Sequence, residues 1–164
     1  MSTKIYLASP FFTDEEALVV ATVENILRKR GLEVFSPREH EVRSGTEVGS
    51  PEWSKEIFLM DTNAILDCDI MVMLYHGNYS DSGTAWEAGF AYARDIPTVV
   101  VQLGDLSNIM IHSSWDINIS FEDLYTYDFE TTPKRIYTGN MTWKKLKFFS
   151  KKGWQNNQNM LYSL

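Results

Sequence analysis

Two carboxylates, Asp81 and Glu87, stand six residues apart where an apolar segment gives way to a helical pattern. Residues 70–75 form an apolar run of buried-strand length, and Ala, Phe and Tyr recur at helical spacing over residues 82–94. A carboxylate in the first turn of a helix that follows the carboxyl end of a buried strand lies where open α/β sheets bind and transform small ligands. The pattern predicts an enzyme that uses carboxylates.

The chemistry open to Glu87 is nucleophilic attack. A helix dipole favours the ionised form of a carboxylate in the first turns, and an ionised, positioned glutamate can attack an electrophilic sugar carbon to form a glycosyl-enzyme intermediate. Spacing alone leaves a structural role open, because acidic residues near helix starts commonly only complement the dipole. Asp61 and Asp69 lie nearby, and Asp69, which precedes the strand at its amino end, is expected to be structural.

The elements that would position these carboxylates alternate between strands and helices. Strands are expected over residues 4–8, 32–35, 69–75 and 96–103, with helices over 13–30, 51–66 and 82–94. Residues 108–115 are left unassigned, a short helix is expected over 121–125, and a weak strand near Ile117. This alternation predicts a flavodoxin-like α/β fold, with a mostly parallel sheet of about five strands and helices on both faces.

Bulk composition narrows the class of protein. The 164 residues fit one domain, and 44% hydrophobic with 13% aromatic residues is typical of a folded core. No apolar run approaches the ~20 residues needed to span a bilayer, and the N-terminus lacks the layout of a signal peptide. The single cysteine, Cys68, cannot form an internal disulfide, and no His/Cys cluster has metal spacing. A cytoplasmic protein without a metal or cofactor is expected.

Charge is distributed unevenly along the chain. The net charge of −7 argues against general binding of nucleic acid, which depends on neutralising phosphates. Residues 139–164 hold five lysines and no acidic residue, so residues 1–138 carry 10 basic against 22 acidic side chains, a net charge of −12. We therefore divide the chain into a domain over 1–138 and a basic, aromatic extension over 139–164, expected to pack on that domain. Binding of single-stranded nucleic acid or of a membrane surface is the alternative for the extension.

Three segments share their order and spacing with one enzyme family. They are Ile5-Tyr6 followed by Phe11-Phe12; Asp61 to Asp69, with Asp81 and the Gly-x-x-x-Glu core from Gly83 to Glu87; and Asn108-Ile109-Met110. Through these segments the chain resembles the nucleoside 2-deoxyribosyltransferases, from the first strand to about Tyr137. The resemblance implies transfer of a 2-deoxyribosyl group between nucleobases, in deoxyribonucleoside salvage, with no cofactor.

The resemblance also implies a role for each residue of the site. Glu87 would attack C1′ of a 2′-deoxynucleoside, with retention through a covalent intermediate, and Tyr6 would hold its carboxylate in line. Asp81 would bind sugar hydroxyls. Asp61 would face the base and supply its proton. In a simple doubly wound layout, however, Asp61 points away from the site, and it reaches the base only if its helix crosses the mouth of the pocket.

The remaining roles concern the base and a second subunit. Phe11 and Phe12 would wall the base pocket, while Asn108 and Met110 would reach into the site of a neighbouring subunit. The resemblance thus implies a homo-oligomer, from dimer to hexamer, with shared active sites and small-molecule substrates, namely 2′-deoxynucleosides and purine or pyrimidine bases.

Two departures from the family leave the substrate open. Many members carry glycine in the first loop, where this chain has Ala8-Ser9-Pro10. Members often place a glutamine or similar base reader after the second strand, where this chain has Arg38-Glu39-His40-Glu41. The alternatives are a 2′-deoxynucleoside 5′-monophosphate N-glycosidase, with serines such as Ser9, Ser113 and Ser114 as phosphate ligands, and a non-catalytic nucleotide-binding module.

Overall fold

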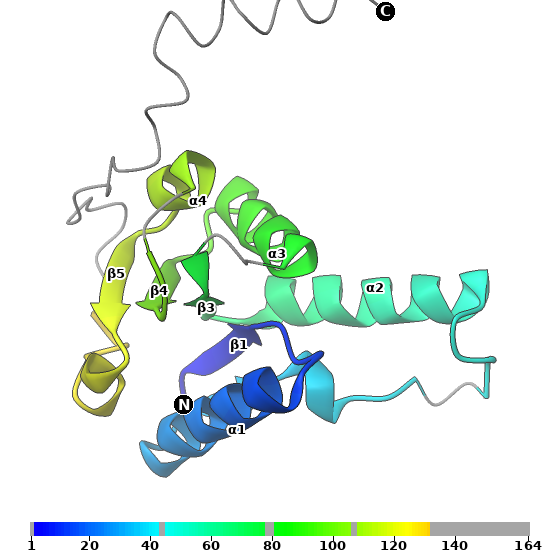
Figure 1. The fold of residues 1–164 in the computed structure, drawn as a ribbon, viewed down its shortest axis with the longest axis horizontal. Coiled ribbons are helices and arrows are strands. Elements are labelled where there is room, and N and C mark those ends of the chain that lie inside the picture. Colours follow the sequence, from blue (N-terminus) through cyan, green and yellow to red (C-terminus); the bar gives the residue numbers. More distant parts are fainter. Residues whose placement is uncertain (1, 43–44, 78–80, 106–107, 132–164) are drawn as a thin grey trace, which may run out of the picture.

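Five parallel strands form the sheet at the centre of the molecule (Figure 1). The computed structural model describes residues 2–42, 45–77, 81–105 and 108–131. The strands are β1 (Lys4–Ala8), β2 (Glu33–Phe35), β3 (Ile70–Tyr75), β4 (Thr98–Gln102) and β5 (Ile117–Ser120). Their order is β2-β1-β3-β4-β5, the flavodoxin-like order. The predicted fold is confirmed, and the weak strand near Ile117 is the edge strand β5.

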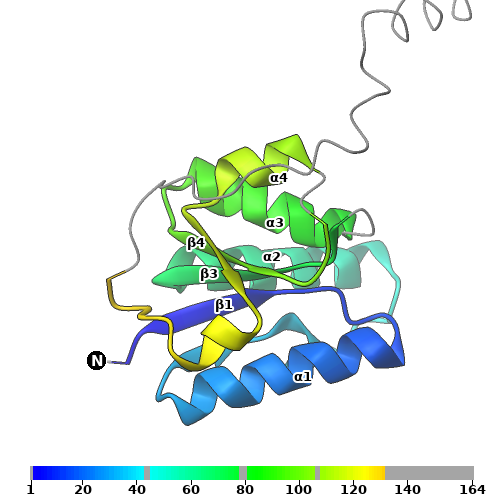
Figure 2. The ribbon, with the colours of Figure 1, turned by 60° about the vertical axis from the view of Figure 1, so that its left-hand side comes forward.

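Helices cover both faces of the sheet, as predicted. Helix α1 (Asp14–Lys29) lies on one face, and α2 (Pro51–Asp67), α3 (Ser82–Ala93) and α4 (Ile109–Ser114) lie on the other (Figures 1 and 2). Alternate residues of β1 point to opposite faces, so Ile5 and Leu7 join the core under α1. Tyr6 joins the core under α2, α3 and α4. Its side chain therefore lies on the face that also carries Asp61 and Glu87.

Side-chain caps fix where the helices begin. The predicted capping box is present at α1, where Thr13 and Glu16 each accept a hydrogen bond from the backbone of the other. Ser50 caps α2, and the unassigned segment forms α4 because the amide oxygen of Asn108 accepts from the N–H groups of Met110 and Ile111. Asp69 is structural, as expected, since its carboxylate accepts the backbone N–H of Lys4 at 2.8 Å.

The 139–164 extension and its expected packing lie outside the described residues. So does the last part of the family resemblance, near Tyr137. Within the described ranges, every helix is too short or too polar to cross a membrane. The cytoplasmic location stays a prediction.

Candidate active site

A cavity of about 360 Å³ opens at the carboxyl end of β1. Its walls come from the loops after β1 and β2, from one side of α2 and from the start of α3. The lining residues are Ser9, Phe11, Phe12, Pro37, Arg38, His40, Trp53, Ile57, Met60, Asp61, Asp81, Gly83, Thr84 and Glu87. The cavity thus brings together three carboxylates from two helices, and it lies where an open α/β sheet binds ligands.

Glu87, which lines the cavity, forms a direct pair with the buried Tyr6. The Tyr6 hydroxyl donates a hydrogen bond of 2.8 Å to Oε1 of Glu87. Burial, followed by the negative charge of Glu87, raises the pKa of Tyr6 well above its ordinary value. Tyr6 therefore keeps its proton and acts as a fixed donor to the carboxylate.

The protonation of Glu87 is governed by burial. Glu87 is the sixth residue of α3, beyond the first turn in which the dipole acts most strongly. The pKa of Glu87 is raised to about 7: burial is the largest cause, the carboxylates of Asp61 and Asp81 add to the rise, and the Tyr6 hydrogen bond opposes it. The expectation that the dipole would favour the ionised form is therefore wrong in its net effect, because desolvation outweighs it.

Asp61 faces the same cavity from the middle of α2. The simple layout that would turn Asp61 away does not apply, because one side of α2 lines the cavity. Burial raises the pKa of Asp61 to about 6, and the charge of His40 opposes this shift. Its Oδ1 is buried without a hydrogen-bond donor among the described residues. Asp61 therefore has an oxygen left for a ligand.

Asp81 has a second task that spacing alone did not reveal. It is the N-cap of α3, and its Oδ2 accepts hydrogen bonds from the N–H of Thr84 at 2.8 Å and from its hydroxyl at 3.2 Å. A Cβ at position 83 would come within 2.8 Å of the same oxygen, so Gly83 leaves room for this cap. Asp81 thereby fixes the start of the helix that carries Glu87.

Aromatic and apolar side chains form the rest of the cavity wall. Phe11 and Phe12 line it and stack on each other with ring centroids 5.2 Å apart. Sequence reasoning missed Trp53, Ile57 and Met60, which line the cavity on the same side of α2 as Asp61. Their spacing of four, three and one residues up to Asp61 follows one helix face and could have identified them.

The pattern of residues and geometry has a counterpart among known proteins. The model of a family described as nucleoside 2-deoxyribosyltransferase matches residues 5–133. The chain belongs to the nucleoside 2-deoxyribosyltransferase family. It is an enzyme of this kind, whose substrates are small nucleosides and bases. A search of curated proteins found no significant match.

One solved structure agrees with this assignment, and two more distant ones share the fold. A 2-deoxyribosyltransferase from Bacillus psychrosaccharolyticus is 38% identical, with a TM-score of 0.76 over 83% of this chain and 100% of that one. A 2-deoxyribosyltransferase from Leishmania mexicana is 20% identical, with a TM-score of 0.59 over 79% and 98% of the two chains. A CMP N-glycosidase from Clostridium botulinum is 18% identical, with a TM-score of 0.52 over 74% and 92%. The last two share the fold.

Two predicted site residues of this deoxyribosyltransferase lie outside the cavity of their own chain. Asn108 caps α4, and Met110 in its first turn is 76% exposed. Neither lines the cavity. Ser113 and Ser114, on the same helix, do not line it either. A single chain of the deoxyribosyltransferase therefore does not bring α4 to its own carboxylates.

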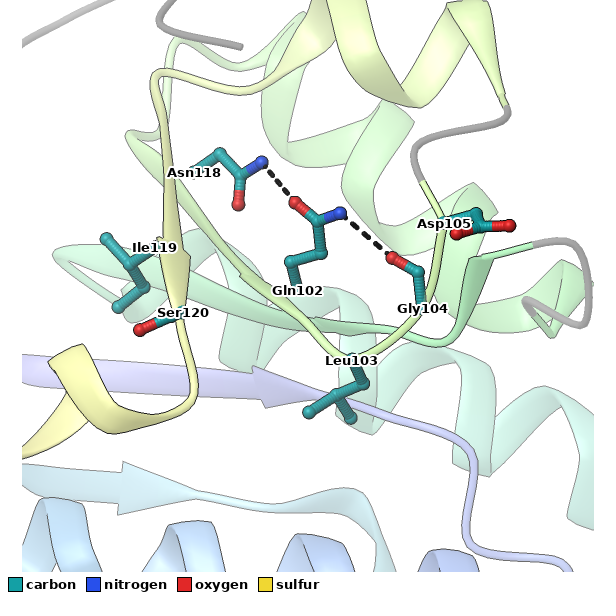
Figure 3. A pocket seen from close by; sticks show the side chains of 7 residues that line it. All are labelled: Gln102, Leu103, Gly104, Asp105, Asn118, Ile119 and Ser120. Atoms are coloured by element: carbon teal, nitrogen blue, oxygen red, sulfur yellow. Dashed lines mark hydrogen bonds between the residues drawn. The ribbon is translucent and has the colours of Figure 1, made fainter. Parts of the chain in front are cut away.

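A second hollow lies at the carboxyl ends of β4 and β5 (Figure 3). Gln102 crosses it, accepting a hydrogen bond from the Asn118 amide and donating one to the Gly104 carbonyl. None of the predicted site residues lines this hollow, and Asp105 is its one charged side chain among the described residues. The carboxylate cavity is therefore the candidate active site. In the part of the chain that the structure describes, no group of three His, Cys, Asp or Glu side chains could hold a metal ion.

Proposed function

We propose that the protein transfers the 2-deoxyribosyl group from a 2′-deoxynucleoside to a second nucleobase, with retention, through a covalent deoxyribosyl-Glu87 intermediate. The hydrogen bond from Tyr6 to Oε1 of Glu87, at 2.8 Å, is the observation that carries this proposal. It orients one carboxylate oxygen and leaves Oε2 for the sugar. Asp61, on the facing helix of the same cavity, is a carboxyl group whose raised pKa suits an acid.

In the first half-reaction, Glu87 attacks C1′ of the nucleoside. The C1′–N bond breaks, its electron pair goes to the base, and the Asp61 carboxyl group gives its proton to that base. Positive charge develops on the sugar during this step, and the buried carboxylate stabilises that charge before it forms the ester bond. Asp81 binds sugar hydroxyls at the start of α3.

The second half-reaction reverses these bonds with a different base. A ring nitrogen of the incoming base attacks C1′, the ester bond breaks, and its electrons return to Glu87. Asp61 takes the proton that the incoming base loses, so the enzyme ends in its starting state. Two inversions at C1′ give net retention and ping-pong kinetics.

The exposed end of α4 supports a shared active site. Ile109 is 56% exposed and Met110 is 76% exposed, next to the Asn108 cap. A homo-oligomer in which this segment of one subunit closes the cavity of another would cover these apolar side chains and bring Asn108 to the substrate.

The 5′-monophosphate alternative has less support in the cavity. Three carboxylates line it, from Asp61, Asp81 and Glu87, and they would repel a phosphate dianion. The one arginine, Arg38, is already paired with Glu24. Ser9 lines the cavity, but its hydroxyl donates to the Pro10 carbonyl. A binding-only module is disfavoured by the Tyr6–Glu87 pair, which positions a nucleophile.

Incubation with thymidine and free adenine, followed by chromatography, tests the proposal. Deoxyadenosine with little free deoxyribose is the expected product. Deoxyribose alone would mean hydrolysis, and cleavage of dTMP or dCMP but not of thymidine would establish the monophosphate enzyme. The Glu87→Ala variant, with unchanged circular dichroism, should form no deoxyadenosine.

A further inference from the structure

His40 lines the active-site cavity without a role in the reaction so far. Its ring stacks on Phe35 with centroids 4.0 Å apart and planes 20° apart, and Phe35 in turn stacks on Tyr6 at 5.6 Å and 15°. One ring, that of Phe35, therefore lies between the His40 imidazole and Tyr6, the residue that holds Glu87. His40 and Glu87 line the same cavity.

The tautomer of His40 is fixed by the backbone. Nδ1 lies 2.9 Å from the Ser36 carbonyl oxygen. A carbonyl oxygen can only accept, so Nδ1 carries the proton and the neutral ring keeps an acceptor lone pair on Nε2. His40 is thus held by one nitrogen, while the other is available to a ligand.

The segment that carries His40 is anchored to α1 by a buried charge. Glu24 is only 2% exposed, and its carboxylate accepts a hydrogen bond of 2.8 Å from Nε of Arg38 and a second from the same guanidinium. Arg28 pairs with Glu39 in the same turn. Two ion pairs on consecutive residues therefore hold the turn Pro37–Glu39 immediately before His40.

Asp61 lines the same cavity as His40 and offers a second hydrogen-bonding group there. The charge of His40 reaches it, and Oδ1 of Asp61 is buried with no donor from the described residues. One unfilled carboxylate oxygen and one imidazole lone pair thus line the same cavity. Hydrogen-bond acceptors of this kind match the N–H groups on the edge of a nucleobase, and the flat apolar walls of Phe11, Phe12 and Trp53 match its faces.

We propose that His40 reads the nucleobase, with Nε2 accepting a hydrogen bond from an N–H on the base edge beside Asp61. This inference rests on the proposed function and assigns the base-reading role to a residue of this chain in place of the missing glutamine. His40 acts on the base alone. It should therefore affect how bases bind, and how well they compete with water for the deoxyribosyl-enzyme.

Two substitutions separate hydrogen bonding from stacking. His40→Phe keeps a ring on Phe35 and loses both nitrogens, whereas His40→Gln loses the ring and keeps a polar end. His40 is exposed, so both variants should fold, which thermal unfolding checks. Calorimetric binding of free adenine and free cytosine to the full chain gives the base affinity of each variant.

The expected result is about tenfold weaker base binding in His40→Phe, the scale of one lost hydrogen bond, with a smaller loss in His40→Gln. With thymidine as donor and adenine as acceptor, His40→Phe should lower the ratio of transfer to hydrolysis to a similar extent. Unchanged base affinity in His40→Phe would overturn the inference. A larger loss of base affinity in His40→Gln than in His40→Phe would also overturn it, because the ring would then serve only as a stacking surface.

The failure of this inference can be told from failure of the proposed function. A wild-type protein that makes deoxyadenosine, with a His40→Phe variant that binds bases and partitions the intermediate as the wild type does, refutes the role of His40 alone. A wild-type protein that cleaves no deoxynucleoside refutes the proposed function, and the inference with it.

Discussion

The Tyr6 hydroxyl and Glu87 Oε1 are joined by a hydrogen bond of 2.8 Å that links strand β1 to helix α3. Tyr6 is completely buried, so its position is fixed by the sheet and by the core around it. The carboxylate it holds has a pKa raised to about 7 by burial. Tyr6 therefore fixes the position of the Glu87 carboxylate, and desolvation gives this carboxylate a pKa close to neutral pH.

Removing that hydrogen bond should move the pH profile in a defined direction. The bond lowers the pKa of Glu87, so Tyr6→Phe should raise this pKa and shift the acid limb of kcat/KM toward higher pH. In the proposed mechanism Glu87 attacks in its ionised form, so activity below pH 7 should fall more than activity at pH 8. The measurement is kcat/KM for thymidine from pH 5 to 9. Tyr127→Phe, on the other face of the sheet, is the control and should leave the acid limb in place.

Neutralising Glu87 should stabilise the fold at alkaline pH. The folded pKa of about 7 lies above the ordinary value of 4.5, so stability due to the protonated carboxyl is complete below about 4.5 and is lost as pH rises through about 7. Glu87→Gln should therefore unfold with a free energy on the order of 3 kcal/mol higher than the wild type at pH 8, since each pKa unit is worth about 1.4 kcal/mol. Near pH 4 the difference should disappear.

Denaturant titrations of both proteins at the two pH values provide this comparison. Equal stability at pH 8 would mean that Glu87 is not buried in the way the structure describes. Because glutamine can still accept the Tyr6 hydrogen bond, the comparison isolates the charge.

Asp61 should control the opposite limb of the pH profile. As the proposed acid it must be protonated, and its pKa of about 6 means that the protonated form declines as pH rises above about 6. We expect a bell-shaped kcat/KM whose two apparent pKa values belong to the Asp61–Glu87 pair. Asp61→Asn should lower kcat by about 10²–10⁴ and remove the alkaline limb. An alkaline limb that persists in Asp61→Asn would assign the acid to another group.

Sequence periodicity was sufficient for the fold because each element has a local cause. The capping box at Thr13 fixed the start of α1, and β3 is an unbroken apolar run that is buried on both faces. The segment 108–115 resisted assignment because α4 has six residues and depends on one side-chain cap from Asn108. Short helices carry too few turns for a periodic pattern to be visible.

The site was predicted less completely, because it depends on how helices and strands that are distant in the sequence lie against one another. Asp81 and Glu87 lie at the N-cap and in the first two turns of α3, and Tyr6 lies inside β1, elements that the parallel topology brings together at one edge. The position of Asp61 depends on the path of α2 past the cavity, which no local pattern contains. The pKa of Glu87 depends on burial by several elements, so the sequence indicated the dipole but not the larger desolvation.

A shared active site predicts complementation between inactive variants. Glu87→Ala lacks the proposed nucleophile, while an Asn108→Ala, Met110→Ala double variant lacks the side chains that we propose reach the neighbour. If sites are shared, mixed oligomers contain some cavities with both an intact Glu87 and an intact α4. Mixing the two variants, after mild dissociation and reassociation, should restore transfer of deoxyribose from thymidine to adenine. Activity that stays at the sum of the separate variants would show that each chain completes its own site.

The buried ion pair of Glu24 and Arg38 should matter to both stability and base binding. Glu24 is 2% exposed, so Glu24→Gln removes the closer of the two carboxylates paired with the Arg38 guanidinium and should destabilise the fold by about 2–3 kcal/mol. It should also loosen the turn that positions His40 and raise KM for the acceptor base. Denaturant unfolding and acceptor kinetics measure the two effects.

Replacing both partners, as Glu24→Met with Arg38→Leu, should recover part of the stability because no buried charge is left unpaired. The exposed pair of Lys4 and Asp67 is the matched control, and Asp67→Asn should leave both quantities unchanged, because solvent already screens that pair.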